Sequence, residues 1–305
     1  MEDKIKTVLS IIAVKMPVLI IKLRFLFRFG RFPNLRNPVD LNEKILYLKL
    51  YSDTSEWTRL ADKFLVRKYV EECGLKDILI PLFGVWNNVN DICWEELPEH
   101  FILKANNGAG TGTNMIVNKS RLKTDDIIII KTTLRSWLEQ KNIGALSAEP
   151  QYRNIHPLII AEKILPIDNI SKSIIDYKFW CFNGKPYSIL VCSDRQKHTI
   201  KLGCYDLKWG WHPDNICVSC KFQREEKPLP KPDMLEEMID IATILSQPFP
   251  QVRVDLYQSE GKVYFGELTF TSLGGLMNYY TQNYLKEMGD AIDLSYTLNC
   301  HYING

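Results

Sequence analysis

The chain has 305 residues, of which 46% are hydrophobic, more than one small core needs and enough for two or three packed subdomains. Its 38 basic and 36 acidic side chains nearly cancel, so the overall charge gives no reason to expect nucleic acid or an acidic macromolecule as a partner. The eight cysteines show no regular spacing, and most lie in apolar, strand-like runs. We therefore expect a reducing, cytoplasmic environment.

The first thirty residues form a basic amphipathic segment, in which apolar side chains are mixed with basic ones such as Lys15 and Lys22. Lys15 and Pro17 keep the apolar stretch well below the roughly 20 residues of a transmembrane helix. No small-residue cleavage site of a signal peptide follows. Two interpretations stay open: residues 1–30 lie on an anionic membrane face, or they pack on the domain as an ordinary helix with solvated lysines.

Beyond residue 31 the sequence has the pattern of a mixed α/β protein. Asp40, with Glu43 three residues later, has the spacing of a capping box and predicts a helix start. Apolar periodicity predicts a further helix over 60–70, ended by Gly74. Runs of apolar and β-branched residues predict strands at 78–82, 101–104, 158–162, 189–192, 252–256 and 263–267.

A glycine-rich segment follows the predicted strand that ends at Lys104. Gly108, Gly110 and Gly112 would let backbone amides approach a polyphosphate closely, and Lys104 would add a positive charge. The spacing is neither that of a Walker loop nor that of a Rossmann fingerprint. Taken alone, the segment is either a phosphate-binding loop or a flexible turn.

Two acidic residues lie on the last pair of predicted strands. Strand alternation puts Arg253 and Asp255 on one face, and the short turn at 260–262 brings Glu267 next to Asp255. Two neighbouring carboxylates repel each other unless a cation lies between them, and an oxygen-rich site of this kind is typical of Mg²⁺. The alternative is a pair of solvated carboxylates on an edge hairpin, which the apolar residues around them disfavour.

Four further motifs each have a common structural explanation. Asp62-Lys63 lies at a predicted helix start, and Glu162-Lys163 closes a predicted strand, where solvated side chains are usual. Cys217 and Cys220, with Cys204 and His212 upstream, have zinc-like spacing but no second close pair, so a turn between strands is the alternative. The 196–232 loops carry ring side chains suited to stacking on sugar rings or to ordinary packing, among them Tyr205, Trp209, Trp211 and His212.

Together and in this order, the motifs resemble the ATP-grasp superfamily, and in particular the TupA-like ATP-grasp family of bacterial surface-polysaccharide gene clusters. The resemblance spans about residues 30–290. It is carried by Asn37-Pro38, Asn42-Glu43-Lys44, Asp62-Lys63, Val66-Arg67, Leu97-Pro98, Lys104-Ala105-Asn106 with its Gly-Xaa-Gly, Asp176-Tyr177-Lys178-Phe179, the run from Arg253 to Tyr257 and the run from Gly266 to Phe270. One departure is Thr269, which stands where many ATP-grasp enzymes have a metal-binding asparagine, so the number of bound ions stays open.

The resemblance implies an α/β (α+β) protein with the ATP-grasp fold, in which two α+β subdomains sandwich the nucleotide. We expect a basic amphipathic segment at 1–30 and an N-terminal α/β region at 31–95. A subdomain with the glycine-rich loop is then expected at 96–165, and one with the metal site and the substrate loops at 166–305.

The resemblance also implies roles for individual residues, with ATP and Mg²⁺ as cofactors. The residues expected to bind the nucleotide are Lys63, Lys104, Asn107, Gly108, Gly110, Gly112, Glu162 and Lys163. Those expected to bind Mg²⁺ are Asp255, Glu267 and Thr269. Arg253 is the candidate for stabilising the charge that develops during transfer. Lys104, Lys178 and Arg195 are further catalytic candidates that would hold phosphate or a substrate carboxylate.

The implied activity is that of a carboxylate–amine ligase acting through an acyl phosphate. Its partners would be ATP, a carboxylate-bearing sugar or polysaccharide precursor, and an amine or amino acid, with no nucleic acid. A glycosyltransferase of capsule or lipopolysaccharide biosynthesis is the alternative, although the Asp-x-Asp metal motif of such enzymes does not occur here. A non-catalytic nucleotide-binding or membrane scaffold is the third reading.

Overall fold

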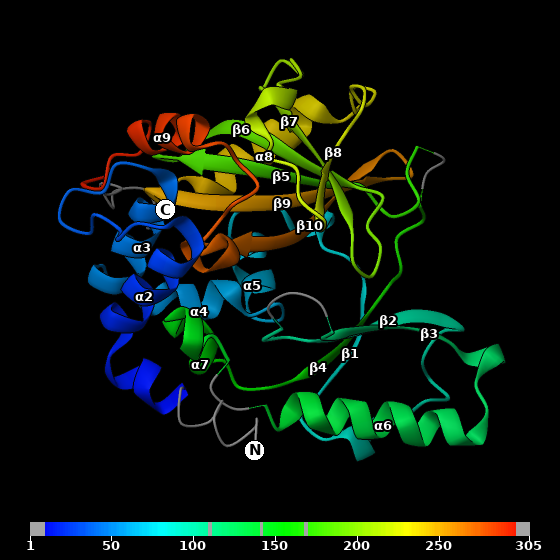
Figure 1. The fold of residues 1–305 in the computed structure, drawn as a ribbon. Coiled ribbons are helices and arrows are strands. Elements are labelled where there is room, and N and C mark those ends of the chain that lie inside the picture. Colours follow the sequence, from blue (N-terminus) through cyan, green and yellow to red (C-terminus); the bar gives the residue numbers. More distant parts are fainter. Residues whose placement is uncertain (1–9, 109–111, 141–142, 168–169, 297–305) are drawn as a thin grey trace.

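The computed structural model describes residues 10–108, 112–140, 143–167 and 170–296. Two sheets dominate this part of the chain (Figure 1), a small one of order β1-β4-β2-β3 and a large one of order β10-β9-β5-β6-β7-β8. The small sheet contains β1 (Leu82–Trp86), β2 (His100–Ala105), β3 (Asn114–Asn118) and β4 (Ile159–Glu162). The large sheet contains β5 (Asp176–Phe182), β6 (Lys185–Ser193), β7 (Ile200–Tyr205), β8 (Phe222–Arg224), β9 (Gln251–Ser259) and β10 (Lys262–Thr269). Only the β7–β8 pair is parallel among these ladders.

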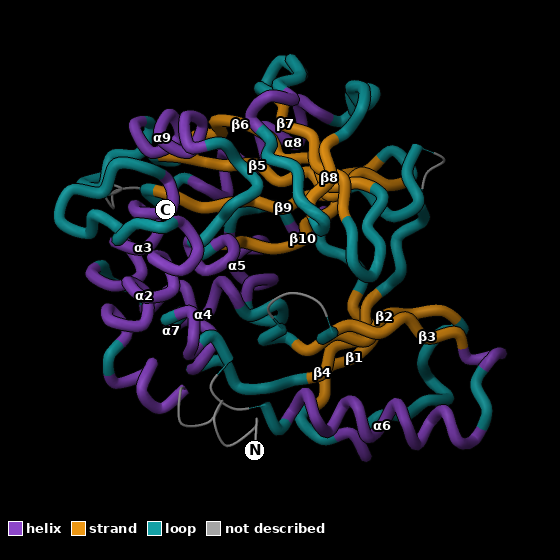
Figure 2. The backbone as a smooth tube through the Cα atoms, in the orientation of Figure 1, coloured by secondary structure: helices purple, strands orange, loops and turns teal. Residues whose placement is uncertain are grey.

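The helices lie in groups around the two sheets and at one end of the molecule (Figure 2). They are α2 (Pro17–Phe29), α3 (Leu41–Tyr51), α4 (Ser55–Ala61), α5 (Val66–Glu72), α6 (Thr124–Leu138), α7 (Pro150–Arg153), α8 (Leu235–Ser246) and α9 (Gln282–Asp290). Helix α6 packs on the small sheet, where Leu134 and Trp137 meet Phe101 and Leu103 in a separate core. No helix among the described residues is both long and apolar enough to cross a bilayer.

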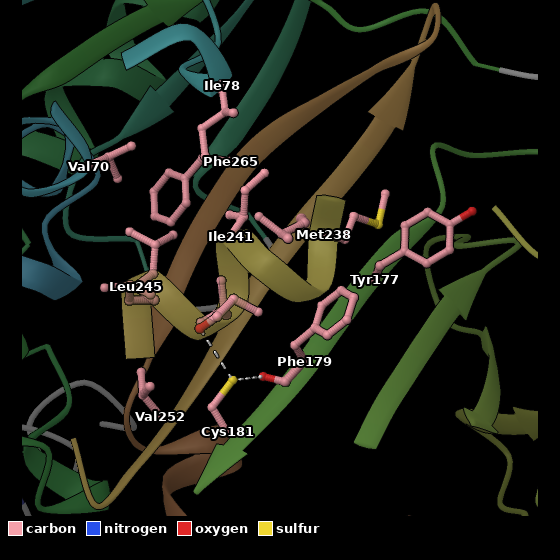
Figure 3. Packing of buried hydrophobic residues seen from close by; sticks show 14 of the residues in the cluster. Val70, Ile78, Tyr177, Phe179, Cys181, Met238, Ile241, Leu245, Val252 and Phe265 are labelled. Atoms are coloured by element: carbon pink, nitrogen blue, oxygen red, sulfur yellow. Dashed lines mark hydrogen bonds between the residues drawn. The ribbon is translucent and has the colours of Figure 1, made fainter. Parts of the chain in front are cut away.

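The large sheet has a different environment on each face because side chains alternate along every strand. On one face, Phe179 and Val252 form the main core with Met238 and Leu245 of α8 (Figure 3). On the other face, Leu190 of β6 packs with residues of α9 in a second core. The part of this second face that lies over β5, β9 and β10 carries charged side chains instead of an apolar layer.

The two predicted helix signals are confirmed in part. The Asp40 carboxylate accepts a hydrogen bond from the Glu43 N–H at 2.8 Å, as an N-cap should. The Glu43 carboxylate, however, accepts from the N–H of Asn34 and Val39 rather than from that of Asp40, so it fixes the preceding loop. The helix predicted over 60–70 is two helices, α4 and α5. The Asp62 carboxylate accepts from the N–H groups that follow it at 2.7 and 3.1 Å, which turns the chain between them.

Four of the predicted strands lie within β2, β6, β9 and β10, and the one predicted at 158–162 begins one residue before β4. The strand predicted at 78–82 is wrong, because Lys76–Ile78 is a 3₁₀ turn and β1 begins only at Leu82, after Pro81. The expected division at 31–95, 96–165 and 166–305 stays a prediction. Since β1 pairs with β4, the small sheet takes strands from both sides of residue 95.

A buried asparagine joins the α4–α5 turn to the small sheet. Asn106, directly after β2, donates to the Asp62 carboxylate and to the His156 carbonyl, both at 2.9 Å. Its own side-chain oxygen accepts from the Leu158 N–H at 2.7 Å, and its backbone carbonyl accepts from the Lys63 N–H at 3.0 Å. The turn that carries Lys63 is therefore fixed to the end of β2 and to the start of β4.

We predict that Asn106→Ala lowers the free energy of unfolding by at least about 2 kcal/mol, because it removes the three hydrogen bonds of a fully buried amide. Urea denaturation measures the loss. Asn37→Ala, at an exposed loop position, is the control and should change little. Equal stability of wild type and the Asn106 variant would show that the amide does not hold the turn.

Candidate functional site

Seven charged side chains follow one another across the large sheet and form what we call the charged row. It consists of Arg195, Asp176, Lys178, Asp255, Arg253, Glu267 and Lys63. Strand register explains the alignment, because Lys178 on β5 lies opposite Asp255 on β9, and Asp255 lies opposite Glu267 on β10. The predicted proximity of Asp255 and Glu267 is therefore confirmed.

The centre of the row is a buried carboxylate with two cationic partners. Asp255 is 1% exposed. Arg253 donates to both of its oxygens, at 2.7 and 2.8 Å, and Lys178 also forms an ion pair with it. Burial alone would lower the pKa of Lys178, but Asp176 and Asp255 outweigh burial and raise it. The protein's own cations thus neutralise the charge of Asp255.

Glu267 is the accessible carboxylate of the row, with 39% of its side chain exposed. Lys63 lies 3.2 Å and Arg253 3.5 Å from its oxygens, and the Thr269 hydroxyl donates to it at 3.1 Å. Burial would raise the pKa of Glu267, but Lys63, Lys178 and Arg253 outweigh it and hold the pKa well below its usual value. The contacts of Glu267 are looser than those of Asp255, so it is the carboxylate that is freer to exchange partners.

Lys63 connects the row to the segment after β2. Its ammonium donates to the Gly108 carbonyl at 3.1 Å while it pairs with Glu267. Gly108 has no room for a side chain, since a Cβ there would lie 2.2 Å from the Thr113 hydroxyl. Asn107 is 2% exposed, and its side-chain oxygen has no partner among the described residues. Gly112 adopts a left-handed backbone (φ +98°), and Gly110 lies outside the described residues.

A second cluster of charges lies on the small sheet. Lys104 pairs with Glu162 at 2.7 Å across the neighbouring strands β2 and β4, and Arg67 of α5 reaches the same carboxylate at 3.5 Å. Arg67 was not predicted as a site residue; its place in the Val66-Arg67 motif was the only sequence signal. Lys163 is not part of this cluster, because its side chain lies 3.7 Å from Glu260 at the tip of the β9–β10 hairpin.

The two clusters together carry a net positive charge. The row has four cations and three anions, and the small-sheet cluster has two cations and one anion, which gives six against four and a net charge of +2. An excess of cations concentrated in one region attracts an anionic ligand. The predicted residues Lys63, Lys104, Lys178, Arg195 and Arg253 all belong to it.

Behind the row, the chain adds a polar wall that sequence analysis did not identify. Arg253 donates to the Ser272 hydroxyl at 2.7 Å. The neighbouring Thr271 donates to Glu149 at 2.5 Å and accepts from the Gln151 amide at 2.7 Å. Lys49 donates to the carbonyls of Ser147 and Gly274 and so ties α3 to both segments of this wall. Apart from Arg253 and Ser272, which are 19 residues apart, these partners are more than ninety residues apart in the sequence, which is why no local pattern predicts them.

The zinc and sugar-stacking interpretations receive no support. Among the described residues, no group of three or more His, Cys, Asp or Glu side chains could hold a metal ion.

Trp209 stacks on Tyr205, with ring centroids 4.2 Å apart, and its indole N–H donates to the Leu229 carbonyl, so both rings are part of the core. His212 lies 3.3 Å from Asp206. Trp211 is one of the residues that line a cavity of about 510 Å³, but no residue of the charged row lines this cavity.

Comparison with known proteins identifies one family. The sequence model described as TupA-like ATPgrasp matches residues 43–293. By sequence, no curated protein matches the chain.

Three solved structures show a distant likeness. The D-alanine–D-alanine ligase from Bacillus anthracis complexed with ATP is 16% identical, over 77% of this chain and 65% of that one (TM-score 0.45). An ADP complex of N5-carboxyaminoimidazole ribonucleotide synthetase is 11% identical, over 74% and 49% (TM-score 0.45). The ATP-grasp ligase PsnB, complexed with a variant of its minimal precursor, Mg and ADP, is 11% identical, over 82% and 65% (TM-score 0.41). The chain therefore spans only 49% to 65% of their lengths, and the family assignment rests on the sequence match.

We predict that Lys49 makes stability depend on pH. Burial lowers the pKa of Lys49 to about 7, whereas the unfolded residue titrates near ~10.4. Between these values the unfolded state binds more protons, so the free energy of unfolding should rise with pH, by up to about 1.4 kcal/mol per unit. Lys49→Met should remove this slope, which urea denaturation between about pH 7 and 9 can measure. Identical slopes for wild type and variant would contradict the assignment.

Proposed function

The chain belongs to the TupA-like ATP-grasp family, and from this membership we propose that it is an ATP- and Mg²⁺-dependent ligase that joins a carboxylate to an amine. The observation that carries the proposal is the position of Lys63. Its ammonium contacts Glu267 on the large sheet and the Gly108 carbonyl after the small sheet. A ligand that binds there meets cations from both sheets at once.

We propose that ATP binds along this cationic region. Lys63 and Lys104 hold phosphate oxygens, and both already form ion pairs with carboxylates. The side-chain oxygen of Asn107, which has no partner among the described residues, can accept from a ribose hydroxyl, and the tight backbone at Gly108 adds a close-fitting wall. Glu162, paired with Lys104 and Arg67, lies at the end of β4 and orients the two cations.

The donor set also fits a magnesium ion. Glu267 is exposed enough to bind a cation directly, and Asp255 stands opposite it on the neighbouring strand. Mg²⁺ prefers carboxylate oxygens shared with phosphates, and it neutralises phosphate charge when bound. Both oxygens of Asp255 already accept from Arg253, and Thr269 donates to Glu267. We therefore propose Glu267 as the principal metal-binding residue, with Asp255 and Thr269 supporting it.

The proposed reaction has two steps and needs no protein nucleophile. A substrate carboxylate oxygen attacks the γ-phosphorus of ATP, the bond to ADP breaks, and an acyl phosphate forms. A neutral amine then attacks the acyl carbon, phosphate leaves, and one proton is released as the amide forms. Arg253, which already bridges Asp255 and Ser272, is the guanidinium that can stabilise negative charge in either step.

We further propose that the carboxylate belongs to a uronic-acid-containing surface polysaccharide or its precursor and that the amine is an amino acid or a related compound. The family's association with surface-polysaccharide genes supports this assignment. We place the enzyme in the cytoplasm or at the inner face of the membrane. Release of ADP that requires both a uronic acid and an amine would test the proposal. ATP consumption that needs neither would overturn it.

We predict that Glu267→Gln lowers ADP release by at least about a hundredfold while the fold stays intact, because one accessible charge is lost at constant volume. Asp255→Asn should lower ADP release too, and in addition it should lower the free energy of unfolding by about 3–5 kcal/mol. The reason is that it leaves Arg253 and Lys178 buried beside a neutral group. Coupled ADP detection and urea denaturation separate the two effects. Glu236→Gln, on the exposed side of α8, is the control. Full activity of the Glu267 variant would exclude it as a metal ligand.

A further prediction concerns Lys104→Ala, which removes a charge-assisted contact to phosphate and should weaken nucleotide binding about 10- to 100-fold. Lys68→Ala is the matched control, because Lys68 lies beside Arg67 but is 77% exposed. Titration calorimetry with a non-hydrolysable ATP analogue and Mg²⁺ measures both. Equal affinities of wild type and the Lys104 variant would rule out the phosphate contact.

A further inference from the structure

Helix α2 and the helical residues before it are apolar on two opposite sides. The inner side carries Ile21 and Phe25, which are buried against Leu35, Leu46 and Leu276. The outer side exposes five apolar residues, which we call the outer stripe: Ile12, Met16, Leu19, Leu23 and Phe27. Their exposed fractions run from 37% at Leu23 to 86% at Phe27. Within α2, spacings of four residues place Leu19, Leu23 and Phe27 along one face of the helix. Ile12 and Met16 precede α2, beyond the non-helical backbone at Met16 (φ −131°), and continue the exposed apolar surface together with Ile11 and Val14.

The charge around the outer stripe is of one sign. Residues 4–39 contain eight basic residues and no acidic one. Lys15, Lys22 and Arg28 are exposed on this helical segment, and none of them forms an ion pair with a carboxylate of the described residues. A solvated apolar stripe flanked by unpaired cations is the surface of a helix that lies in the interface of an anionic bilayer.

From this surface we propose that the outer stripe docks the protein on an anionic lipid membrane, with α2 parallel to the bilayer plane. Ile21 and Phe25 fix the helix to the domain, so the helix docks without separating from the fold. Phe27 and Leu23 enter the boundary between headgroups and acyl chains, and Lys15 and Lys22 contact lipid phosphates. The proposal rests on this helix alone and is independent of the ligase activity.

Charge favours a lipid surface over a second copy of the chain. A two-fold dimer through the outer stripe would bring the basic residues of both copies together, and like charges at short distance repel each other. An anionic bilayer instead provides negative charge on both sides of the stripe. Each basic side chain at such a surface raises partitioning roughly fivefold, since it contributes about 1 kcal/mol.

Deleting the segment would be a poor test, because the deletion would expose the apolar residues that Ile21 and Phe25 cover. Point variants of the full chain avoid this problem. Leu23→Ser combined with Phe27→Ser removes apolar groups that are already exposed, and Lys15→Gln combined with Lys22→Gln removes two charges. Ile128→Ser combined with Ile129→Ser is the matched control, because these α6 residues are 60% and 62% exposed but belong to the small-sheet region.

The experiment is cosedimentation of the full chain with vesicles of phosphatidylglycerol and phosphatidylethanolamine at low salt. We expect binding that weakens at high salt and is absent with phosphatidylcholine alone. The Leu23/Phe27 pair should lower partitioning at least about tenfold and the Lys15/Lys22 pair about 25-fold, with the control unchanged. ADP release on a soluble acceptor should be the same in all variants. No binding by wild type, equal loss in the control, or a dimer that the Leu23/Phe27 pair dissociates would each overturn the proposal.

Discussion

The burial of the Asp255 carboxylate is the constraint on which the site depends. A charge that is 1% exposed is tolerated only with close partners, and here β9 supplies Arg253 and β5 supplies Lys178. Lys178 in turn forms a second ion pair with Asp176, and the same Asp176 carboxylate also pairs with Arg195. The charged row is therefore a consequence of placing one carboxylate inside a sheet. Five of its seven positions are set by strand register, which is more rigid than a loop, whereas Lys63 and Arg195 lie outside the strands.

The same electrostatics connects the two sheets. Lys63 pairs with Glu267 on one side and with the Gly108 carbonyl on the other, while Asn106 holds the turn from which Lys63 projects. Because the link uses the half-exposed Glu267 rather than the buried Asp255, it can change without leaving a buried charge unpaired. The structure thus combines a rigid electrostatic centre with a more adaptable contact at its edge.

How far the sequence predicts this arrangement depends on the range of each interaction. Arg253, Asp255 and Glu267 were predictable because strand alternation and a short hairpin determine their neighbours. Arg67 and Lys49 were not, since their partners lie far away in the sequence. Strand β5 escaped prediction because Asp176 and Lys178 interrupt its apolar run, and their counter-charges come from other strands. Asp62 was expected at a helix start but instead separates two helices, because its carboxylate binds the backbone that follows.

The N-terminal helix shows why the two interpretations of residues 1–30 do not exclude each other. Its inner side is part of the fold, because Ile21 and Phe25 complete a core with Leu46 and Leu276. Its outer side serves no packing purpose among the described residues, yet it carries large apolar groups whose exposure to water is unfavourable. A helix that needed only the inner contact would be more soluble with polar residues at Leu23 and Phe27. The presence of apolar groups on both sides fits the proposed position of this helix between a protein core and a bilayer.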